Sequence, residues 1–553
     1  MKQKIIFIGF LTLLTLTFFI LILNLKKDED TTITLSYDES KYNETFENYD
    51  EININLDDIN NIYKITKGGI YHFTGNLNGY ISINTKDDVK IILDSVTITN
   101  DNGPCLYGID SNSLYIELIG ENILTDGANY QGSLTDVKGV IYSKDDVIIE
   151  GSGTLKIKAN HEDGIVSTDT LVIKSGNYVI ESVDDAIRGK DMVIILDGTF
   201  EISAQGDGIK SSNEKDKTLG NILILNGNFT ITSTNDAVEA KNSLEIDDGV
   251  FAITTGGGAK IQSTNTMRGF GDRNNNKSSE TSKGIKAENS IIIKNITLEA
   301  NTYDDAIHCN GTVEIDGGNI SITTSDDGIH ADDLITILSG TIDIKQSYEG
   351  IEASIIKING GKISIVASDD GINASDGSGS SEMMPGGMGT KESNTDVMLV
   401  INGGEIYVNA DGDGLDSNGS IYIHGGSITV DGPTNDGNGP LDYDATLEIS
   451  GGTLIVAGSS GMMQNATSST QGTVLIYFSE TQSAGTTVKI GDKFTYTPNK
   501  NFSCILVSSL DLNIGETYTI TLNDQEYETF TLTSTISSIG NSSRSGMMNG
   551  MRR

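Results

Sequence analysis

The chain has 553 residues and carries 77 Asp and Glu against 37 Lys and Arg, which gives a formal net charge of −40 at pH 7. This excess of acid argues against nucleic acid and anionic membrane surfaces as partners, because both would be repelled, and it favours cations or ligands reached through cations. The three cysteines, Cys105, Cys309 and Cys504, lie far apart and form neither a disulfide framework nor a CxxC metal pair.

The first 30 residues have the pattern of an export signal. Lys2 and Lys4 precede an uncharged, mostly apolar run over 5–25, which is followed by KKDED. A helix of this length reaches across the hydrocarbon core of a membrane, which is about 30 Å thick. No A-x-A-like cleavage site and no cysteine for lipid attachment follow the run, so we expect an uncleaved signal anchor over 1–30 rather than a cleaved signal peptide. Either alternative places the acidic remainder outside the cell, anchored at its surface or secreted.

Residues 31–130 are rich in β-forming residues but do not follow the period of the region after them. We expect them to form a β-rich N-terminal cap, because the terminal coils of a repeat structure need covering. The repeat itself is expected over 131–455.

Two markers recur in that region in one register, with a period near 22 residues. Turn glycines close β-rich runs at Gly176, Gly198, Gly227, Gly249, Gly318, Gly340, Gly361, Gly404, Gly426 and Gly452, and Lys294 replaces one further glycine. Nine residues after a turn glycine comes an acid, at Asp185, Asp207, Asp236, Asp327, Glu349, Asp370 or Asp413, and Asp163 lies 22 residues before Asp185.

A period near 22 is too short for a propeller blade, and the region lacks both the leucine-rich-repeat pattern and helical periodicity. It predicts an all-β parallel β-helix with three short strands per coil, in which Ile, Val and Leu fill the interior. About a dozen coils at about 4.8 Å each would make a rod near 60 Å long. Departures from the period predict loops at 211–220, 263–282 and 375–394.

Stacked coils would bring the acids of successive turns one strand spacing apart. Two such charges repel by about 1 kcal/mol in water and by several times that near a protein surface, so the column predicts a bound cation. Oxygen-only ligands on turns suit Ca²⁺, whereas Zn²⁺ or Cu²⁺ would require His or Cys clusters, which we do not expect. The candidate calcium ligands are Asp163, Asp184, Asp185, Asp207, Asp236, Asp304, Asp305, Asp326, Asp327, Glu349, Asp369, Asp370 and Asp413.

The alternative interpretation of these turns is that Asp-Gly is simply good turn chemistry, with acids that face the solvent. In TSDDGIHADD (324–333) we expect Ile329 to point into the core and Asp326 and Asp327 to face outwards.

A second column follows each acidic turn and is cationic over part of its length. Its basic members could hold an acidic sugar or supply a catalytic base, and the alternative is that they only compensate the charge of the acids. These candidate carbohydrate-binding residues are Arg188, Lys210, Lys286, His308 and His330.

Beyond the repeat, residues 456–535 predict an antiparallel C-terminal β cap. We expect residues 536–553 to form a disordered tail.

Several segments resemble a known family of proteins: GENILTDG (120–127), KGVIYSKDDVIIEGSGTL (138–155), EDGIVSTDTLVI (162–173), DDAIRGKDMVII (184–195), GDGIKSSN (206–213) and NGPLDYDATLEISGGTL (438–454). They look like the exported carbohydrate-binding β-helix proteins of clostridia and related bacteria, which are similar in architecture to pectate lyases. The resemblance covers about 45–525 and implies a right-handed parallel β-helix, with calcium in the acidic turns, that binds cellulose or polygalacturonate. The motif keeps a single acid at Asp236 and Glu349 and is lost at Lys283–Gly284. The family implies no catalytic residue.

Three functions remain open, and the residues do not decide whether the chain is an enzyme. The favoured one is a non-catalytic, monomeric, cell-surface protein in which Ca²⁺ bridges a polysaccharide to the acidic edge. The second is a calcium-dependent polysaccharide lyase in which Arg188 or Lys210 removes a proton. The third is a structural adhesin or spacer that the metal only stiffens.

Overall fold

The computed structural model describes residues 35–43, 46, 49–260, 281–376 and 396–541. The predicted signal anchor over 1–30 and most of the predicted loops at 263–282 and 375–394 lie outside these residues. Among the residues that are described, no helix is both long enough and apolar enough to span a membrane. The described part of the chain contains three short 3-10 turns, at Glu39–Lys41, Leu56–Asp58 and Gly132–Leu134.

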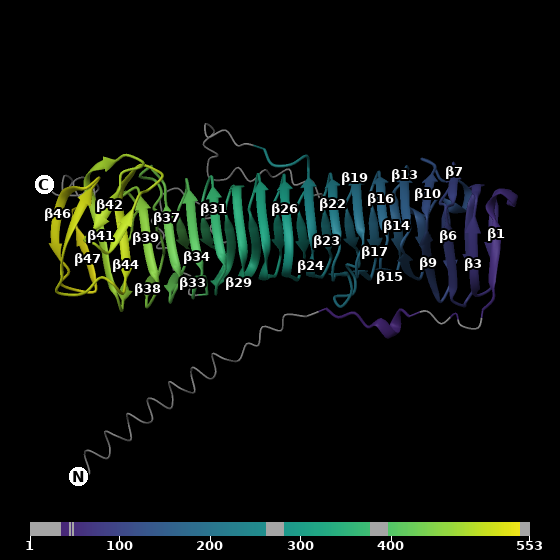
Figure 1. Ribbon diagram of the computed structural model, residues 1–553, viewed down its shortest axis with the longest axis horizontal. Helices are drawn as coiled ribbons and strands as arrows, with labels where there is room; N and C mark the ends of the chain where they lie inside the picture. The colour runs from purple at the N-terminus through teal and green to yellow at the C-terminus, as the bar shows by residue number, and fades with distance from the viewer. Residues whose placement is uncertain (1–34, 44–45, 47–48, 261–280, 377–395, 542–553) are drawn as a thin grey trace, which may run out of the picture. The chain divides into compact units, whose positions relative to one another are not determined.

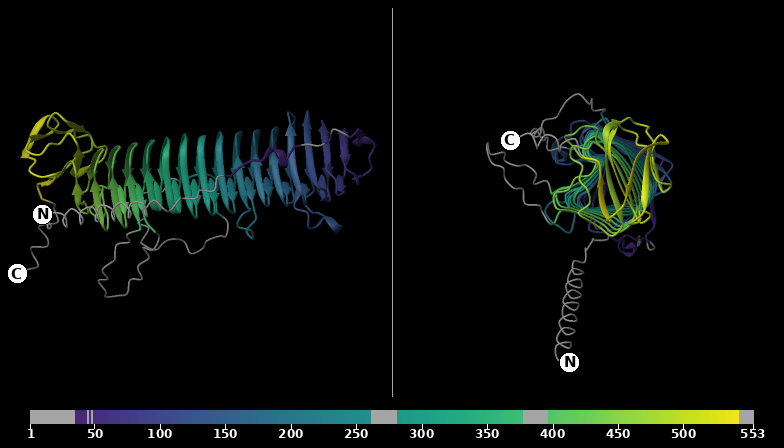
Figure 2. Two further views of the ribbon diagram at one scale, coloured as in Figure 1. Left: turned by 90° about the horizontal axis from the view of Figure 1, so that it is seen from below. Right: turned by 90° about the vertical axis from the view of Figure 1, so that its left-hand side faces the viewer.

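Between residues 51 and 469 the described chain is a parallel β-helix of three strand columns, which we call A, B and C (Figures 1 and 2). Column A holds β1 (Glu51–Asn55), β3 (Gly69–Thr74), β6 (Val89–Asp94), β9 (Ser113–Ile119), β12 (Asp146–Gly151), β15 (Thr170–Ile173), β18 (Met192–Ile195), β21 (Asn221–Ile224), the first parts of β24 (Ser243–Thr255), β26 (Ser290–Thr302) and β28 (Thr312–Thr324), the middle of β29 (Ile329–Ser347), the end of β30 (Ile351–Ile358), β33 (Met398–Ile401), β36 (Ser420–Ile423), β38 (Thr446–Ile449) and β40 (Ser468–Ser469). Column B holds β4 (Asn76–Asn78), β7 (Thr97–Asn100), β10 (Glu121–Asp126), β13 (Thr154–Ala159), β16 (Asn177–Ser182), β19 (Thr199–Ala204), β22 (Asn228–Ser233), the later parts of β24, β26, β28 and β29, β31 (Lys362–Ala367), β34 (Glu405–Ala410), β37 (Ser427–Asp431) and β39 (Thr453–Gly458). Column C holds β2 (Ile62–Ile65), β5 (Tyr80–Asn84), β8 (Leu106–Asp110), β11 (Gly139–Ser143), β14 (Asp163–Ser167), β17 (Ile187–Gly189), β20 (Ile209–Ser211), β23 (Val238–Ala240), β25 (Ile285–Ala287), β27 (Ile307–Cys309), the starts of β29 and β30, β32 (Ile372–Ala374) and β35 (Leu415–Ser417).

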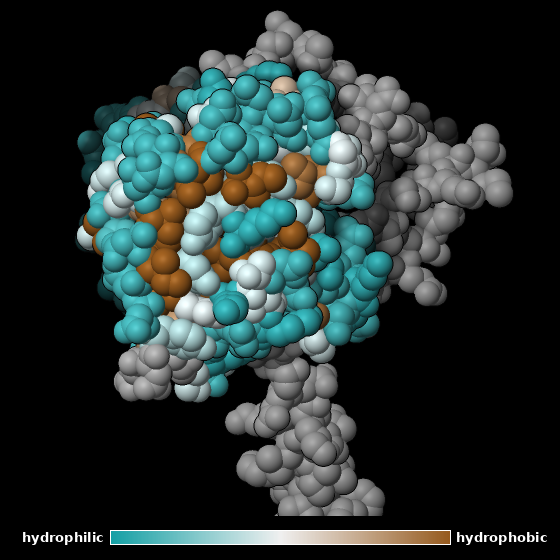
Figure 3. Space-filling model, turned by 90° about the vertical axis from the view of Figure 1, so that its right-hand side faces the viewer, coloured by the Kyte–Doolittle hydropathy of each residue, from teal (hydrophilic) through white to brown (hydrophobic). Residues whose placement is uncertain are grey.

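The predicted parallel β-helix is therefore confirmed, but the stack starts earlier than expected. β10 pairs in parallel with β7 before it and with β13 after it, so the strand pairing runs without a break through residue 130. The residues before 130 depart from the period because their coils differ in length, not because they leave the stack. At the N-terminal end, seen along the stack in Figure 3, apolar side chains of the first coil lie among hydrophilic ones, and Tyr49 and Ile52 are both exposed.

The C-terminal end is built differently. β44 (Phe502–Ser509) pairs antiparallel with β39 and with β41 (Gly472–Gln482), and a separate sheet holds β42 (Val488–Ile490), β43 (Phe494–Tyr496), β45 (Thr517–Leu522) and β46 (Gln525–Thr531). β47 (Ile536–Ile539) lies parallel to β41. The expectation of a disordered tail from residue 536 is thus wrong at its start, because β41 offers residues 536–539 a strand to pair with; residues 542–553 lie outside the described part.

Because adjacent coils pair in register, equivalent core side chains lie on top of one another. Column B stacks Tyr178, Phe200, Phe229 and Phe251 in register, with neighbouring ring centroids 4.8, 4.7 and 4.5 Å apart and the ring planes within 7° of parallel. All four side chains are at most 2% exposed. Equivalent positions of adjacent coils have the same surroundings, so these large side chains stack on one another and fill the interior of the coils without voids.

The turns between columns A and B require glycine. All ten predicted turn glycines have positive φ, between 77° and 147°. At Gly318 (φ 80°) an added Cβ would lie 2.4 Å from the carbonyl oxygen of Ile296 in the preceding coil. A side chain there would combine backbone strain with a clash, which accounts for the periodic glycine.

Candidate functional site

The turns between columns B and C carry a stacked row of acids, which we call the acid column: Asp163, Asp185, Asp207, Asp236, Asp305, Asp327, Glu349, Asp370 and Asp413. A carboxylate of one coil accepts a hydrogen bond from the backbone N–H at the equivalent position of the next coil. These donors and acceptors, with N···O distances of 2.5–3.2 Å, are Asp185 to Asp163, Asp207 to Asp185, Asp236 to Asp207, Lys283 to Asp236, Asp327 to Asp305, Glu349 to Asp327, Asp413 to Asp370 and Gly439 to Asp413. Eight of the nine acids therefore tie their turn to the next, which gives them a structural role whatever else they bind, whereas Glu349 accepts from the Asn373 side chain instead.

This hydrogen bond also decides the direction of the side chain. Asp326 is exposed, but Asp327 is only 8% exposed because its Oδ1 turns inwards to the N–H of Glu349. The expectation that both carboxylates face outwards is thus wrong for Asp327, whereas Ile329 lies in the core as predicted.

Among the acids that precede a column member, Asp184 is exposed like Asp326, whereas Asp304 and Asp369 are half-buried. Asp304 receives a hydrogen bond from Lys283, 3.0 Å away. These four residues therefore form the outer rim of the acidic turns.

Column C places a second row in register, three residues after each acid from Asp185 onwards and three residues after Lys283: Arg188, Lys210, Glu239, Lys286, His308, His330, Glu352, Asn373 and Asp416. Its basic members contact the acids. Arg188 pairs with Asp163, Lys210 lies 2.5 Å from Asp207 and 3.6 Å from Asp185, and Lys286 lies 3.0 Å from Asp236.

At the coil where the acidic motif is lost, Lys283 performs the same task. Its Nζ is 2.5 Å from Asp305 Oδ2, and together with burial this makes it an internal counter-charge. Burial on its own raises the pKa of Asp305, but the Lys283 ammonium together with His308 and His330 outweighs it and holds the pKa well below the usual range of a carboxyl.

From Asp163 to Asp327, the cation sought for the acid column is therefore supplied by the chain itself. The predicted carbohydrate-binding residues Arg188, Lys210, Lys286, His308 and His330 are all engaged in these pairs, as the charge-compensation alternative requires.

The situation changes after His330, where the second row becomes acidic or neutral. Glu349, Asp370, Asp413 and Asp416 are half-buried, and among the described residues none of them forms an ion pair with lysine or arginine. Burial, followed by repulsion from neighbouring carboxylates, raises the pKa of Asp416 to about 8 and that of Asp370 well above its ordinary value. Burial also raises the pKa of Asp413 to about 6. We call Glu349, Asp370, Asn373, Asp413 and Asp416 the uncompensated stretch.

Asn373 adds to this stretch a buried oxygen that has no hydrogen-bond donor among the described residues. Its Nδ2 donates to Glu349 Oε2 at 2.9 Å, but its Oδ1 is buried without a hydrogen-bond donor among the described residues. A buried carbonyl oxygen left in this state costs about 1–3 kcal/mol, and the acids around it offer no proton donor when ionised. A cation would satisfy both, and the donors are all oxygen, as Ca²⁺ prefers. The uncompensated stretch thus offers oxygen ligands to a cation, whereas the acids from Asp163 to Asp327 already have basic partners in the chain.

The two histidines of the second row lie together, contrary to the expectation that the chain has no histidine cluster. His308 and His330 stack with ring centroids 4.9 Å apart because their strands are in register in adjacent coils. Three-residue groups with ligand atoms within 4.8 Å of one another contain His330 twice, once with Asp305 and His308 and once with Asp327 and Glu352. Burial on its own lowers the pKa of His330, but its hydrogen bonds to Asp327 and Glu352 outweigh it and raise the pKa to about 11.

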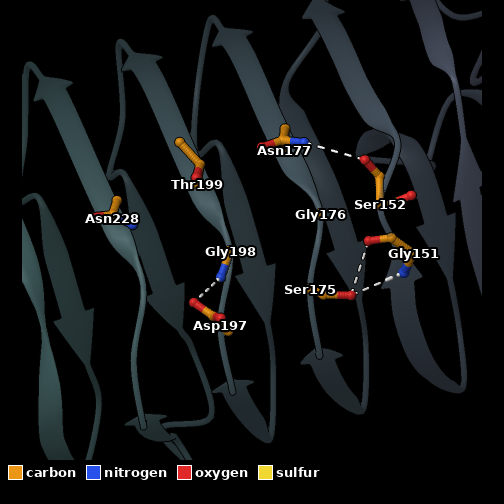
Figure 4. Close-up of a pocket in the computed structure, with 9 residues that line it drawn as sticks. All are labelled: Gly151, Ser152, Ser175, Gly176, Asn177, Asp197, Gly198, Thr199 and Asn228. Atoms are coloured by element: carbon orange, nitrogen blue, oxygen red, sulfur yellow. Dashed lines mark hydrogen bonds between the residues drawn. The ribbon is translucent and has the colours of Figure 1, made fainter.

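A shallow pocket of about 510 Å³ lies on a different edge, at the turns between columns A and B (Figure 4). Its polar side chains come from four successive coils and include Asn177, Thr199 and Asn228, which are in register. The pocket offers amides, hydroxyls and the Asp197 carboxylate, so it supplies hydrogen bonds but little charge.

Comparison with known sequences bears on the glycan prediction. Residues 59–328 match a family model described as "Carbohydrate-binding domain-containing protein". The predicted resemblance to carbohydrate-binding β-helix proteins is thus confirmed for that range.

A curated protein from Acetivibrio thermocellus with the same description is 32% identical over 148 residues, which cover 24% of this chain and 52% of that protein. The chain therefore spans about half the length of this curated relative. A solved structure, the polysaccharide lyase-like protein from C. thermocellum as a gadolinium derivative, is 29% identical with a TM-score of 0.36 and covers 37% of this chain and 91% of that one.

Proposed function

We propose that this protein is a non-catalytic polysaccharide-binding protein of the cell surface or the surrounding medium, and that it holds Ca²⁺ in the uncompensated stretch to bind acidic glycans such as polygalacturonate. The family match over residues 59–328 supports the carbohydrate as ligand. The observation that carries the calcium is the change of charge along the second row, from Arg188 and Lys210 in the early coils to Asn373 and Asp416 in the late ones.

Several features of the uncompensated stretch suit it for this task. The carboxylates of Glu349, Asp370, Asp413 and Asp416 are half-buried, so they are held by the turns and yet accessible from outside. Asn373 adds a neutral carbonyl oxygen to the charged ones. A bound Ca²⁺, with six to eight oxygen ligands, would supply positive charge and coordination positions for the carboxylate and hydroxyl oxygens of a sugar.

The lyase alternative requires a base that is neutral near neutral pH, and the geometry gives it no support. Arg188 is paired with the buried Asp163. Burial on its own lowers the pKa of Lys210, but the carboxylates of Asp207, Asp185 and Glu239 outweigh it, so that its pKa is raised. Lys210 is therefore held in its charged form, which cannot remove a proton, and Arg188 is engaged by Asp163.

Retention on polygalacturonate and on cellulose, each with Ca²⁺ and with EDTA, tests the proposal. We expect retention on polygalacturonate with Ca²⁺ and its loss with EDTA or in the double variant Asp370→Asn/Asp413→Asn. Asp197→Asn removes an exposed acid on another edge and serves as the control that keeps binding. Retention on neither glycan, or retention that EDTA leaves unchanged, would overturn the proposal, and unsaturated product absorbance in the same incubation would establish the lyase instead.

A further inference from the structure

One cluster of metal-ligating side chains lies beside the uncompensated stretch but differs from it in chemistry. His330 Nδ1 is 3.2 Å from Asp327 Oδ2 and 3.0 Å from Glu352 Oε2. In a tetrahedral site with metal–ligand bonds of about 2.0 Å, neighbouring ligand atoms lie about 3.3 Å apart. Both contacts of His330 Nδ1 thus already have nearly the separation that one small divalent ion imposes, and the ligand atoms of the three residues lie within 4.8 Å of one another.

The other ring nitrogen of His330 provides a second, independent observation. Its Nε2 faces Asp332 Oδ1 at 3.3 Å, on the side away from Asp327 and Glu352. A carboxylate that accepts from the far N–H of a metal-binding histidine fixes the tautomer that leaves the near nitrogen free to coordinate. The stacked His308 repeats the arrangement, with Nδ1 at 2.8 Å from Asp305 Oδ2 and Nε2 at 3.1 Å from Asn310 Oδ1.

The neighbouring charges favour one of the two histidines. The carboxylate of Asp305 is already paired with Lys283, so a metal ion at His308 would have to compete with an ammonium group 2.5 Å from the same oxygen. Among the described residues, Asp327 and Glu352 pair with no lysine or arginine, so a metal ion here would replace only the Nδ1 proton through which His330 contacts both carboxylates.

The two carboxylates of this site are held in place, and one side of the site is open to a metal ion from solution. Asp327 and Glu352 are 8% and 6% exposed, and Asp327 is fixed by the N–H of Glu349. The His330 side chain is 19% exposed, so one side of the cluster opens to solvent.

We propose that Asp327, His330 and Glu352 form a binding site for one divalent transition-metal ion of the Zn²⁺ type. The imidazole nitrogen sets this site apart from the all-oxygen uncompensated stretch, because Zn²⁺ takes His and carboxylate ligands whereas Ca²⁺ takes oxygen alone. The site has three protein ligands and leaves a fourth position open to water or to an oxygen of a bound ligand. It does not depend on the proposed glycan function.

Titration of the metal-free full chain with Co²⁺, followed by visible absorption and by displacement with Zn²⁺, tests the proposal. We expect one Co²⁺ per chain with a spectrum typical of tetrahedral coordination that includes nitrogen. His330→Asn and, as a second variant, Glu352→Gln should each weaken binding by more than about 100-fold, since even the partners of ligands contribute 10- to 100-fold. Thermal melts check that both variants fold.

His72 provides a matched control. It also lies between two carboxylates, but Glu51 contacts Nδ1 at 2.8 Å and Asp94 contacts Nε2 at 3.3 Å, so a single ion could not replace both contacts. We expect His72→Asn, and likewise Asp370→Asn/Asp413→Asn, to leave the Co²⁺ spectrum and affinity unchanged. The proposal is overturned if the wild type shows no tetrahedral Co²⁺ spectrum, in which case His330 carries only a compensating proton. It is equally overturned if His330→Asn binds as the wild type does, or if His72→Asn lowers the affinity as much.

Discussion

Replacing Arg188 by methionine removes the counter-charge of Asp163 while keeping the length of the side chain. Asp163 is fully buried and Arg188 is 21% exposed, so the variant leaves an unpaired carboxylate inside the protein. Removing one partner of a buried ion pair costs about 3–5 kcal/mol. We expect the lower end, about 3 kcal/mol, because the N–H of Asp185 still donates to Asp163 and Arg188 is not fully buried.

Urea unfolding at pH 7, followed by circular dichroism, measures this loss. Adding Asp163→Asn removes the stranded charge and keeps an oxygen for the N–H of Asp185, so the double variant should recover about 2 kcal/mol of the loss. Lys362→Met breaks an exposed pair with Glu405, 63% and 67% exposed, and should change stability by less than about 1 kcal/mol.

The loss should also depend on pH. Burial already raises the pKa of Asp163 well above its usual value, with Arg188 opposing that shift. Without Arg188 the folded state favours the protonated acid more strongly, so the deficit should shrink as the pH falls and grow as it rises. Equal unfolding midpoints for Arg188→Met and Lys362→Met would refute the reasoning that the chain neutralises its own early acids.

Three further predictions concern the same column and its core. In EDTA, the free energy of unfolding should fall as the pH rises from about 5 to about 8, because burial raises the pKa of Asp413 to about 6 and that of Asp416 to about 8. An acid whose pKa is raised in the folded state stabilises the fold while it is protonated and loses this stabilisation as the pH rises through that pKa. A free energy of unfolding that does not change with pH, measured by denaturant titration, would contradict this. Lys283→Met should make the melting temperature more sensitive to EDTA than that of the wild type, because Asp305 loses its ammonium partner and needs a cation from solution; an EDTA-induced shift no larger than that of the wild type would count against it. Phe229→Ala should cost about 3–5 kcal/mol in urea unfolding by opening a cavity in the aromatic stack, and a loss below about 1 kcal/mol would show that the stack repacks.

The period near 22 was sufficient to predict the β-helix, because one glycine and one acid per coil must recur wherever coils stack. It failed before residue 130, where coils of unequal length hide the same pairing of β10 with its neighbours. The sequence pattern also could not predict that the Asp327 side chain turns inwards, because this direction depends on a backbone N–H of the next coil and not on a residue adjacent in sequence.

The contacts of the charged and polar residues were likewise predictable only in part. The spacing of 22 residues between His308 and His330 places them side by side, so their cluster could have been predicted from the register alone. In the sequence, Lys283 marks a coil in which the acidic motif is lost, and only its contact with Asp305 in the structure identifies it as the counter-charge of that acid. The free Oδ1 of Asn373 could not be predicted, because it follows from which neighbours leave that oxygen without a donor.

Calcium titration calorimetry of the full chain is the most direct test of the central claim, that the late coils need a cation which the early coils carry within themselves. The account predicts that the wild type binds Ca²⁺, that Asp370→Asn/Asp413→Asn weakens binding at least about tenfold, and that Asp207→Asn, whose carboxylate already lies 2.5 Å from Lys210, leaves it unchanged. An absence of Ca²⁺ binding, or equal weakening by Asp207→Asn and by the double variant, would contradict it.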